Sequence, residues 1–194
     1  MAETSDKVVF RAQKIAARDA IPAADRSARS ATLLHDVLAL PQVAAATSVF
    51  TFVSHGSEVD THPLIDALLD AGKRVAVPLI LPRKDDPDRQ MLAVPIASRD
   101  ELTPGIMGIL SPPIPNPEIP TPNFTPDLVL VPGVAFALES PTRITRLGYG
   151  GGYYDRYLAK HPNAATLGLC FAEQLADALP TEPHDITLQA LATC

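Results

Sequence analysis

A fourteen-residue segment, 143–156, carries the combination of side chains best suited to binding phosphate. It reads RITRLGYGGGYYDR, and its glycines are Gly148, Gly150, Gly151 and Gly152. Because glycine has no Cβ, backbone N–H groups can crowd around an anion, and the N-terminus of a following helix adds roughly half a positive charge. Arg143, Arg146 and Arg156 can contact phosphate oxygens, and Asp155 can hold a hard cation such as Mg²⁺. The segment therefore predicts a phosphate-binding loop.

The residues of this segment also leave a simpler interpretation open, because a glycine cluster is typical of a tight turn. The pattern is not the phosphate loop that ends in Gly-Lys-Ser/Thr. It is not the dinucleotide pattern Gly-x-Gly-x-x-Gly either, because Tyr153 occupies the last glycine position after Gly148 and Gly150. The three arginines and the carboxylate close to these glycines favour the phosphate-binding interpretation.

A second set of cations lies in the helix predicted from Lys7 to Ala20. Its members are Lys7, Arg11, Lys14 and Arg18, spaced 4, 3 and 4 residues apart. At about 100° per residue, this spacing places all four on one narrow face. Like charges three or four residues apart repel by a few tenths of a kcal/mol per pair. Two interpretations stay open, namely a basic surface stripe and a set of cations that awaits a polyphosphate.

The elements around these residues indicate an α/β fold. Residues 48–53 predict a strand, Pro63 to Gly72 a helix and Lys73 to Pro78 a second strand, which together make a βαβ unit with a parallel sheet. Ligands of such sheets gather beyond the carboxyl ends of the strands. The segment Ser54–Thr61, which carries Glu58, is therefore expected at the edge of the site, either as a ligand-binding segment or as the first turn of a helix.

The remaining elements complete one three-layer α/β/α domain over residues 1–194, Rossmann-like, with a mostly parallel sheet. We expect a helix over 25–40, strands over 91–96, 128–131, 165–171 and 186–192, and helices over 153–160 and 173–178. The phosphate-binding segment follows the strand 128–131 after a long loop. Residues 82–90 predict a polar turn, and the proline-rich stretch 109–126 a long surface crossing.

Composition narrows the class of partner. The formal net charge of −6 argues against nucleic acid or an anionic membrane, since both reward broad basic surfaces. Two cysteines make neither a disulfide framework nor a metal site, and the first six residues lack the features of a secretory signal. The apolar run 128–138 is too short to span a bilayer. We therefore expect a cytoplasmic monomer that binds small molecules.

The segment 146–156, RLGYGGGYYDR, following LVLVPGVAF at 128–136, closely resembles the signature of the 5-formyltetrahydrofolate cyclo-ligase family, also called 5,10-methenyltetrahydrofolate synthetase. The resemblance extends to Lys7 and Arg11, to 54–61 and to 179–185. It implies a three-layer α/β/α fold and an ATP- and Mg²⁺-dependent ligase. Its substrate is 5-formyltetrahydrofolate, its product is 5,10-methenyltetrahydrofolate, and ADP and phosphate are released.

The resemblance also implies the residue roles. Catalysis falls to Arg146, Tyr153 and Asp155, and Asp155 also binds the metal. ATP is contacted by Lys7, Arg11, Arg146, Leu147, Gly148, Tyr149, Gly150, Gly151, Gly152, Tyr153 and Tyr154. The folate is contacted by Val53, Glu58 and residues Tyr149, Gly150, Gly151, Gly152 and Tyr153.

Three departures from the family pattern support an alternative, a folate- or nucleotide-binding protein with weak or no turnover. Ser111 and Gln189 stand where carboxylates are common, and the segment after Phe136 lacks the usual aspartate and glycine. An amide oxygen binds a cation less well than a carboxylate does. A third alternative is sugar-phosphate or thioester chemistry on a similar scaffold.

Overall fold

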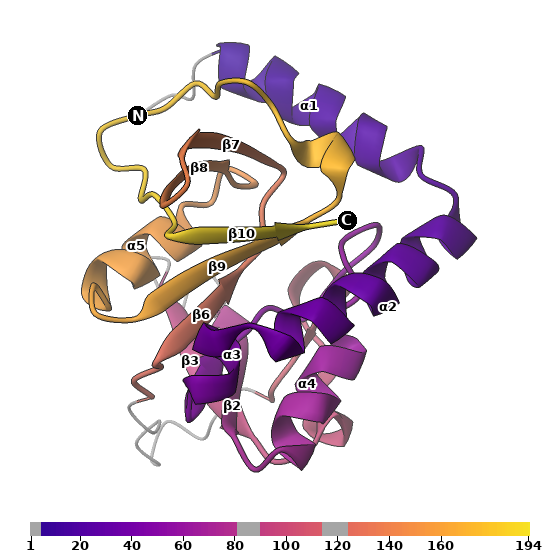
Figure 1. Cartoon of the computed structure of the whole chain (residues 1–194), viewed down its shortest axis with the longest axis vertical. Coiled ribbons are helices and arrows are strands. Elements are labelled where there is room, and N and C mark those ends of the chain that lie inside the picture. The colour runs from indigo at the N-terminus through magenta and orange to yellow at the C-terminus, as the bar shows by residue number, and fades with distance from the viewer. Residues whose placement is uncertain (1–4, 81–89, 114–123) are drawn as a thin grey trace.

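One sheet joins segments from almost the whole length of the chain. The computed structural model describes residues 5–80, 90–113 and 124–194, and the six strands of this sheet lie in the order β10-β9-β6-β1-β2-β3 (Figure 1). They are β1 (Ser48–Phe50), β2 (Arg74–Ile80), β3 (Met91–Ile96), β6 (Leu128–Val131), β9 (Ala165–Cys170) and β10 (Ala190–Thr193). All neighbours pair in parallel except β2 and β3. The predicted α/β fold with a mostly parallel sheet is confirmed.

Successive residues of the central strands pack on opposite sides of the sheet, as the period of two in a strand requires. Val49 belongs to a core that also contains residues of α2 (Ala23–Ala39), α3 (Pro41–Ala45) and α4 (His62–Asp70). Phe50 belongs to a second core, where its ring lies 4.5 Å from that of Tyr157 in α5 (Tyr153–Lys160). Both residues are fully buried. The sheet therefore has one helical layer on each face.

The predicted long loop before the glycine segment is wrong, because most of it forms an antiparallel hairpin. Strand β7 (Ala135–Ser140) pairs with β8 (Arg143–Leu147), with a register shift between Leu138 and Ser140. The hairpin packs with α5 in the second core through Phe136 and Ile144. It brings Arg146 and the glycine segment back to the end of β6, which is where the phosphate-binding residues were expected.

Other boundaries differ less. Strand β1 ends at Phe50 rather than residue 53, β10 begins at Ala190 rather than 186, and the expected helix 173–178 is a single 3₁₀ turn, η3 (Ala172–Gln174). Helix α3 was not predicted. Short elements η1 (Arg99–Glu101), β4 (Thr103–Pro104), η2 (Ile106–Gly108) and β5 (Leu110–Ser111) fill part of the connection after β3. The turn expected over 82–90, apart from Gln90, and the middle of the proline-rich stretch, 114–123, lie outside the described residues.

The two central strands are joined at their starts by the carboxylate of Asp127. Its Oδ2 accepts hydrogen bonds from Thr47 N (2.8 Å), Thr47 Oγ1 (2.6 Å) and Ser48 N (3.0 Å). Hydrogen bonds that favour the charged form lower its pKa to about 2, with the Thr47 side chain as the largest cause. Asp127 thus fixes the amino end of β1 beside β6.

We expect this carboxylate to make folding stability depend on pH. A depressed folded-state pKa contributes stability that is present above the unfolded pKa near 4 and is lost as pH falls through about 2. Urea unfolding between pH 7 and pH 2 should therefore show a steeper loss of stability for the parent chain than for Asp127→Asn. Parallel pH profiles for the two chains would contradict the assignment.

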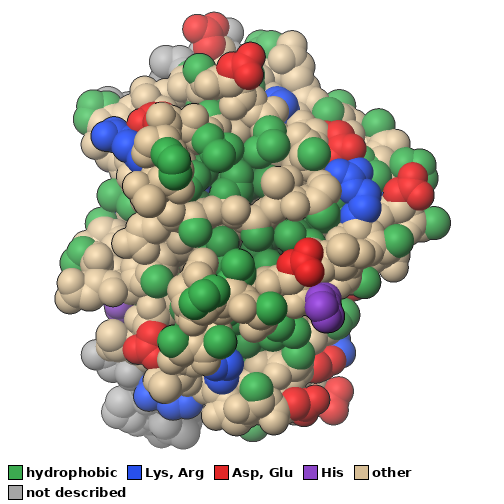
Figure 2. Space-filling model, viewed as in Figure 1, with side chains coloured by type: hydrophobic (Ala, Val, Ile, Leu, Met, Phe, Trp, Pro, Cys, Tyr) green, Lys and Arg blue, Asp and Glu red, His purple; other side chains and the backbone are tan. Residues whose placement is uncertain are grey.

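The face shown in Figure 2 carries little concentrated positive charge. On the face in Figure 2, hydrophobic side chains gather over the middle of the molecule, and most charged side chains lie nearer its margins. Within the described residues, no helix is both long enough and apolar enough to cross a bilayer. Three cations are instead buried, with exposed fractions of 5% for Lys7, 5% for Arg18 and 7% for Arg146. These inward-facing cations are candidates for binding an anion.

Candidate functional site

Helix α1 (Ser5–Asp19) lies across the end of the molecule where the parallel strands finish (Figure 1). Its cationic side faces inward, while Val8 and Val9 are about half exposed. All four cations contact residues far away in the sequence: Lys7 contacts 182 and 185, Arg11 contacts 148, Lys14 contacts 173 and 175, and Arg18 contacts 57 and 149. The open alternative of a basic surface stripe is therefore wrong.

Lys7 forms the first of these contacts with two carboxylates. Its Nζ lies 2.8 Å from Glu182 Oε2 and 2.9 Å from Asp185 Oδ2. Burial alone would lower the pKa of Lys7, but hydrogen bonds to Glu182 and Asp185 and their charges raise it above its ordinary value. Asp185 Oδ2 also accepts from the backbone N of Glu182, at 2.7 Å. Lys7 thereby holds the 182–185 turn against α1.

Substitution of Lys7 should cost measurable stability, because Lys7→Met leaves two neighbouring carboxylates without their cation. We expect a loss of about 1–3 kcal/mol in the free energy of unfolding at pH 7. The loss should shrink near pH 4, where the carboxylates begin to take up protons. Urea titration is the measurement, and Lys160→Met, at an exposed lysine in α5, is the control, with an expected change below about 0.5 kcal/mol. An equal loss in the two variants would contradict the pairing.

The second contact joins α1 to the glycine segment. Arg11 Nε donates to Gly148 O at 2.7 Å. Downstream, Gly150 and Gly152 have φ values of 95° and 64°, which L-residues with a Cβ rarely adopt, and Gly152 is the residue directly before α5. Over the described part of the chain, the backbone N–H groups of Gly150, Gly151 and Gly152 donate no hydrogen bond. These amides remain available to an anion at the start of a helix.

Arg146 and Asp155 form a buried ion pair between β8 and α5. Nη2 of Arg146 lies 2.9 Å from both carboxylate oxygens of Asp155, and the two side chains are 4% and 16% exposed. The guanidinium also lies over the Tyr154 ring, while its Nε is buried without a partner among the described residues. Asp155 Oδ1 accepts a further hydrogen bond from Ile186 N at 3.2 Å. The pair thus contacts the same 182–186 segment that Lys7 holds.

A cavity of about 400 Å³ lies beside this ion pair. Its walls come from the hairpin and from the segment 181–187: Glu139, Arg143, Thr145, Arg146, Thr181, Glu182, Pro183, Asp185, Ile186 and Thr187. Ligand atoms of Glu182, His184 and Asp185 lie within 4.8 Å of one another. Carboxylate oxygens are the donors that Mg²⁺ prefers. The glycine segment 148–152 is not among the lining residues, but Gly148 lies directly against the guanidinium of Arg146, which is one of them.

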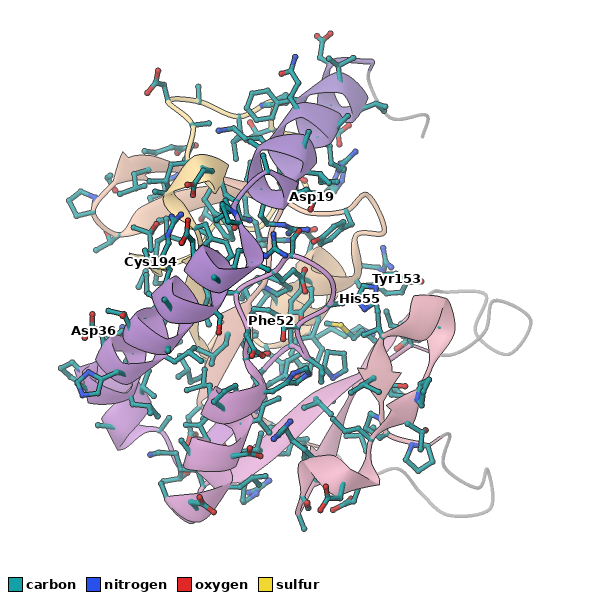
Figure 3. The ribbon with its side chains drawn as sticks, turned by 90° about the vertical axis from the view of Figure 1, so that its right-hand side faces the viewer. Asp19, Asp36, Phe52, His55, Tyr153 and Cys194 are labelled. Carbon is teal, nitrogen blue, oxygen red and sulfur yellow. The ribbon has the colours of Figure 1, made fainter. Side chains whose placement is uncertain are left out.

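A second, narrow crevice lies where the strand order reverses, between the carboxyl ends of β1 and β6. It is lined by Arg18, Phe52, Glu58, Val59, Pro132, Gly133, Leu169 and Gln174. Arg18 Nη1 donates to the Tyr149 hydroxyl at 2.8 Å, and that hydroxyl donates to Glu58 Oε1 at 2.7 Å. Burial and the charge of Glu58 raise the pKa of Tyr149 well above its usual range. Figure 3 shows Asp19 at the end of α1 above the segment that carries Phe52 and His55.

The structure brings most of the predicted site residues to this end of the molecule. Hydrogen bonds connect the segments that carry Lys7, Arg11, Glu58, Arg146 and Asp155. Residues of the glycine segment take part in these hydrogen bonds. Two other predicted residues, Val53 and Tyr154, pack in the cores, and Leu147 is buried as well, so these three side chains pack with the protein. Tyr153 is half-buried, with Arg156 over its ring.

Gln189 stands at a position where the family pattern favours an aspartate, and it is hydrogen-bonded to Thr166. Its Oε1 accepts from Thr166 N at 3.1 Å, and its own N donates to Thr166 Oγ1 at 2.9 Å. The side chain therefore joins β9 to the start of β10 and does not line the cavity. Ser111 pairs with Thr103 in the short β4–β5 hairpin.

Sequence reasoning gave no site role to Arg18, Glu182 or Asp185. Arg18 was visible as the last cation of the stripe, but its partners Ser57 and Tyr149 are 39 and 131 residues away. Asp185 follows His184, whose ring is 58% exposed and 3.9 Å from its carboxylate. Lys7 could have pointed to both carboxylates, because a lysine that the fold buries requires negatively charged partners.

Comparisons with known proteins agree on one family. The model of the 5-formyltetrahydrofolate cyclo-ligase family matches residues 3–194. The chain is 33% identical to 5-formyltetrahydrofolate cyclo-ligase of Escherichia coli K12 over 159 residues, which cover 81% of this chain and 83% of that protein. A probable 5-formyltetrahydrofolate cyclo-ligase of Schizosaccharomyces pombe is 29% identical over 178 residues, 85% and 83% of the two chains.

Solved structures agree as well. The NMR structure of Aquifex aeolicus 5,10-methenyltetrahydrofolate synthetase has a TM-score of 0.77 at 26% identity and covers 96% of this chain and 89% of that one. A 5,10-methenyltetrahydrofolate synthetase from Mycoplasma pneumoniae, 21% identical with a TM-score of 0.69, shares the fold over 96% of this chain and 97% of its own.

Proposed function

The chain belongs to the 5-formyltetrahydrofolate cyclo-ligase family, and we propose that the residues beneath α1 carry out its ATP-dependent ligation. The activity is the conversion of 5-formyltetrahydrofolate into 5,10-methenyltetrahydrofolate, a ligase reaction of one-carbon folate metabolism. One observation carries the residue assignment: the cationic side of α1 lies directly on the glycine segment, with Arg11 Nε 2.7 Å from Gly148 O.

The chemistry of the reaction explains why cations and backbone amides suffice for catalysis. A formamide oxygen is a poor leaving group, and amide resonance makes its carbon a weak electrophile. Transfer of the γ-phosphoryl group to that oxygen breaks the bond to ADP and creates a phosphate leaving group. The N10 amine then attacks the carbon, loses its proton, and phosphate departs as the ring closes. Phosphoryl transfer depends mainly on positioning and charge neutralisation, so no nucleophilic side chain is required.

The phosphates of ATP fit between the free amides of Gly150–Gly152 and the side chain of Arg146. Three N–H donors before α5 and the positive end of the helix favour an anion there. The guanidinium of Arg146 is held by Asp155 and has an unpartnered buried Nε. Arg11 supplies further positive charge from α1, and Lys7, also assigned to ATP, is balanced by Glu182 and Asp185 in this structure. Arg146 thus neutralises charge that develops during transfer, in a site partly shielded from water.

A magnesium ion fits the donors at the cavity. Asp155, Glu182 and Asp185 offer only oxygen atoms, which suits a hard cation, and Asp155 lies next to Ile186 at the cavity wall. We assign Asp155 as the protein ligand; the ion, when bound, neutralises phosphate charge. Gln189 is committed to Thr166, so it does not take part in this proposal.

The reduced pterin is assigned to the Glu58 side of the second crevice, outside it, because the crevice itself is too narrow to admit a ring. Open α/β sheets bind ligands where the strand order reverses, and this crevice lies at that point, between β1 and β6. Glu58 supplies a carboxylate for the pterin N–H groups, and apolar Phe52 and Val53 lie at the end of β1. Tyr149 links the crevice to the glycine segment, so one segment contacts both substrates.

A turnover assay separates this function from that of a binding protein. Purified chain is mixed with 5-formyltetrahydrofolate and MgATP, and methenyltetrahydrofolate absorbance and phosphate release are followed together. We expect one phosphate per methenyl product and no product without ATP. Tight binding of both ligands with no product would instead identify a binding protein that has lost turnover. Product formation without ATP would overturn the ligase proposal.

We also propose that the chain acts as a cytoplasmic monomer. Its two cysteines, Cys170 and Cys194, are unpaired thiols, which suits a reducing compartment. A relative in Arabidopsis thaliana is named as mitochondrial, so the family is not confined to the cytoplasm. Light scattering of the purified chain tests the monomer, and a mass twice that of the chain would overturn it.

A further inference from the structure

We propose that Arg156 is a positioning residue for ATP, and that its guanidinium holds the glycine segment in the conformation in which the amides of Gly150–Gly152 face an anion. This inference rests on the proposed function and deepens it. The family resemblance implies no role for Arg156, although this arginine is the last residue of the segment 146–156.

Arg156 lies one turn into α5 and reaches back across the residues at the start of the helix. Its Nη2 donates to Gly151 O at 2.9 Å, and its guanidinium carbon lies 5.2 Å from the centre of the Tyr153 ring. Its Nη1 lies so close to Gly152 that a Cβ on that glycine would be 2.7 Å away. One side chain therefore contacts three successive residues, 151, 152 and 153.

These contacts fix the direction of a peptide group that faces the proposed phosphate site. The carbonyl of Gly151 and the N–H of Gly152 belong to one planar trans peptide, so they point in opposite directions. Because Arg156 binds the carbonyl, the N–H is turned away from the arginine. Gly150 and Gly152 have φ values of 95° and 64°, and successive N–H groups in such turns form a concave site for an anion. Glycines cannot hold this conformation by themselves, since they have no side chain.

The position of Arg156 argues against a role in helix stability. It is the fourth residue of α5, where the positive end of the helix dipole disfavours a cation. Its side chain is exposed, so it contributes little to the burial of apolar surface. Its backbone N donates to Gly152 O at 3.1 Å, which joins the same turn to the helix. An arginine placed against the helix dipole and bonded to an anion-binding turn is suited to order that turn for a ligand.

NMR relaxation of the glycine amides measures this ordering directly. Selective ¹⁵N labelling of glycine gives ten backbone signals, one for each glycine of the chain. In the parent chain, the order parameters of Gly150, Gly151 and Gly152 should approach that of Gly168, a buried residue of β9, at about 0.85. In Arg156→Ala, these three values should fall below about 0.7, while that of Gly168 stays unchanged.

Calorimetry with the magnesium complex of AMP-PNP, a non-hydrolysable ATP analogue, measures the consequence for binding. We expect Arg156→Ala to raise Kd by about 5- to 20-fold, because the ligand must then order the glycine segment itself. Arg156→Lys keeps a donor for Gly151 O and should stay within about threefold of the parent chain. Lys160→Ala, at an exposed lysine in the last turn of α5, is the matched control and should change Kd less than about twofold.

Two further readouts separate positioning from a direct contact between Arg156 and phosphate. The ratio of the Kd of Arg156→Ala to that of the parent chain should be the same, within about twofold, at about 0.05 M and about 0.5 M salt. A direct contact through an exposed charge would be screened, so a ratio that falls toward one at high salt would overturn the inference. In steady-state kinetics, the loss should appear in KM for ATP, with kcat within about threefold of the parent value.

The remaining outcomes are distinct. Unchanged order parameters or an unchanged Kd in Arg156→Ala would overturn the inference and leave the proposed function intact. Equal losses in Arg156→Ala and Arg156→Lys would also overturn it, because the lysine keeps the donor. Failure of the parent chain to bind the analogue would overturn both the inference and the proposed function. Lower order parameters with weaker binding, in a chain that forms no methenyltetrahydrofolate, would support the inference while contradicting the proposed ligase.

Discussion

Arg146→Ala should reduce kcat/KM for ATP by about 10- to 150-fold. The substitution removes a charge-assisted contact worth about 1.5–3 kcal/mol, and about 1.4 kcal/mol corresponds to a tenfold change in rate. Arg146 is suited to a large effect because its side chain is 4% exposed and therefore acts in a shielded environment. If Arg146 acts on the transition state, the loss should fall mainly on kcat. Steady-state kinetics with varied ATP is the measurement.

Arg99→Ala is the matched control for this experiment. Arg99 also forms a two-point ion pair, with Nε and Nη2 on the two carboxylate oxygens of Asp66, at 2.6 and 2.5 Å. That pair joins η1 to α4 and does not line the cavity. The control should stay within about threefold of the parent chain. Unchanged kinetics in Arg146→Ala would remove Arg146 from the site.

Asp155→Asn should reduce turnover by about 100-fold or more at fixed Mg²⁺. The substitution keeps the shape of the side chain but removes the negative charge that holds Arg146 and that we propose binds the metal. We expect the activity to recover in part at higher Mg²⁺ concentration, because the weakened site fills by mass action. Rates measured over a range of Mg²⁺ concentrations distinguish this from a general loss of folding.

Asp66→Asn, the partner of the control arginine, should leave the Mg²⁺ dependence unchanged. The double variant Arg146→Ala/Asp155→Asn should lose much less activity than the sum of the two single effects, because the residues act as one pair. Additive losses, or a Mg²⁺ dependence equal to that of the parent chain, would contradict the assignment of Asp155.

The sheet and most helices were predictable because their signals are local. Leu128–Val131 is apolar at every position, as a strand covered on both faces requires, and its four residues are fully buried. The helix 153–160 was predicted with its observed bounds, since glycine precedes it and a proline follows it closely. The hairpin was missed because β7 and β8 carry polar residues such as Glu139 and Arg143, and their pairing contains an irregular register.

The site was only partly predictable for a different reason. Spacing alone showed that the four cations of α1 share one face, but it could not show which way that face points. The answer depends on acceptors supplied by distant segments: Glu182 and Asp185 for Lys7, Gly148 for Arg11. The pairing of Arg146 with Asp155, two residues predicted separately for nucleotide and metal, likewise depends on the angle between β8 and α5. Sequence supplies the residue types, and the packed fold decides their partners.

Transfer of isotope from the formyl oxygen tests the account most directly. The chain is supplied with 5-formyltetrahydrofolate that carries ¹⁸O in the formyl group and with unlabelled MgATP, and the released phosphate is analysed by mass spectrometry. If the formyl oxygen is phosphorylated before ring closure, each phosphate carries one ¹⁸O atom for each methenyltetrahydrofolate formed. Unlabelled phosphate accompanying product would contradict the proposed chemistry.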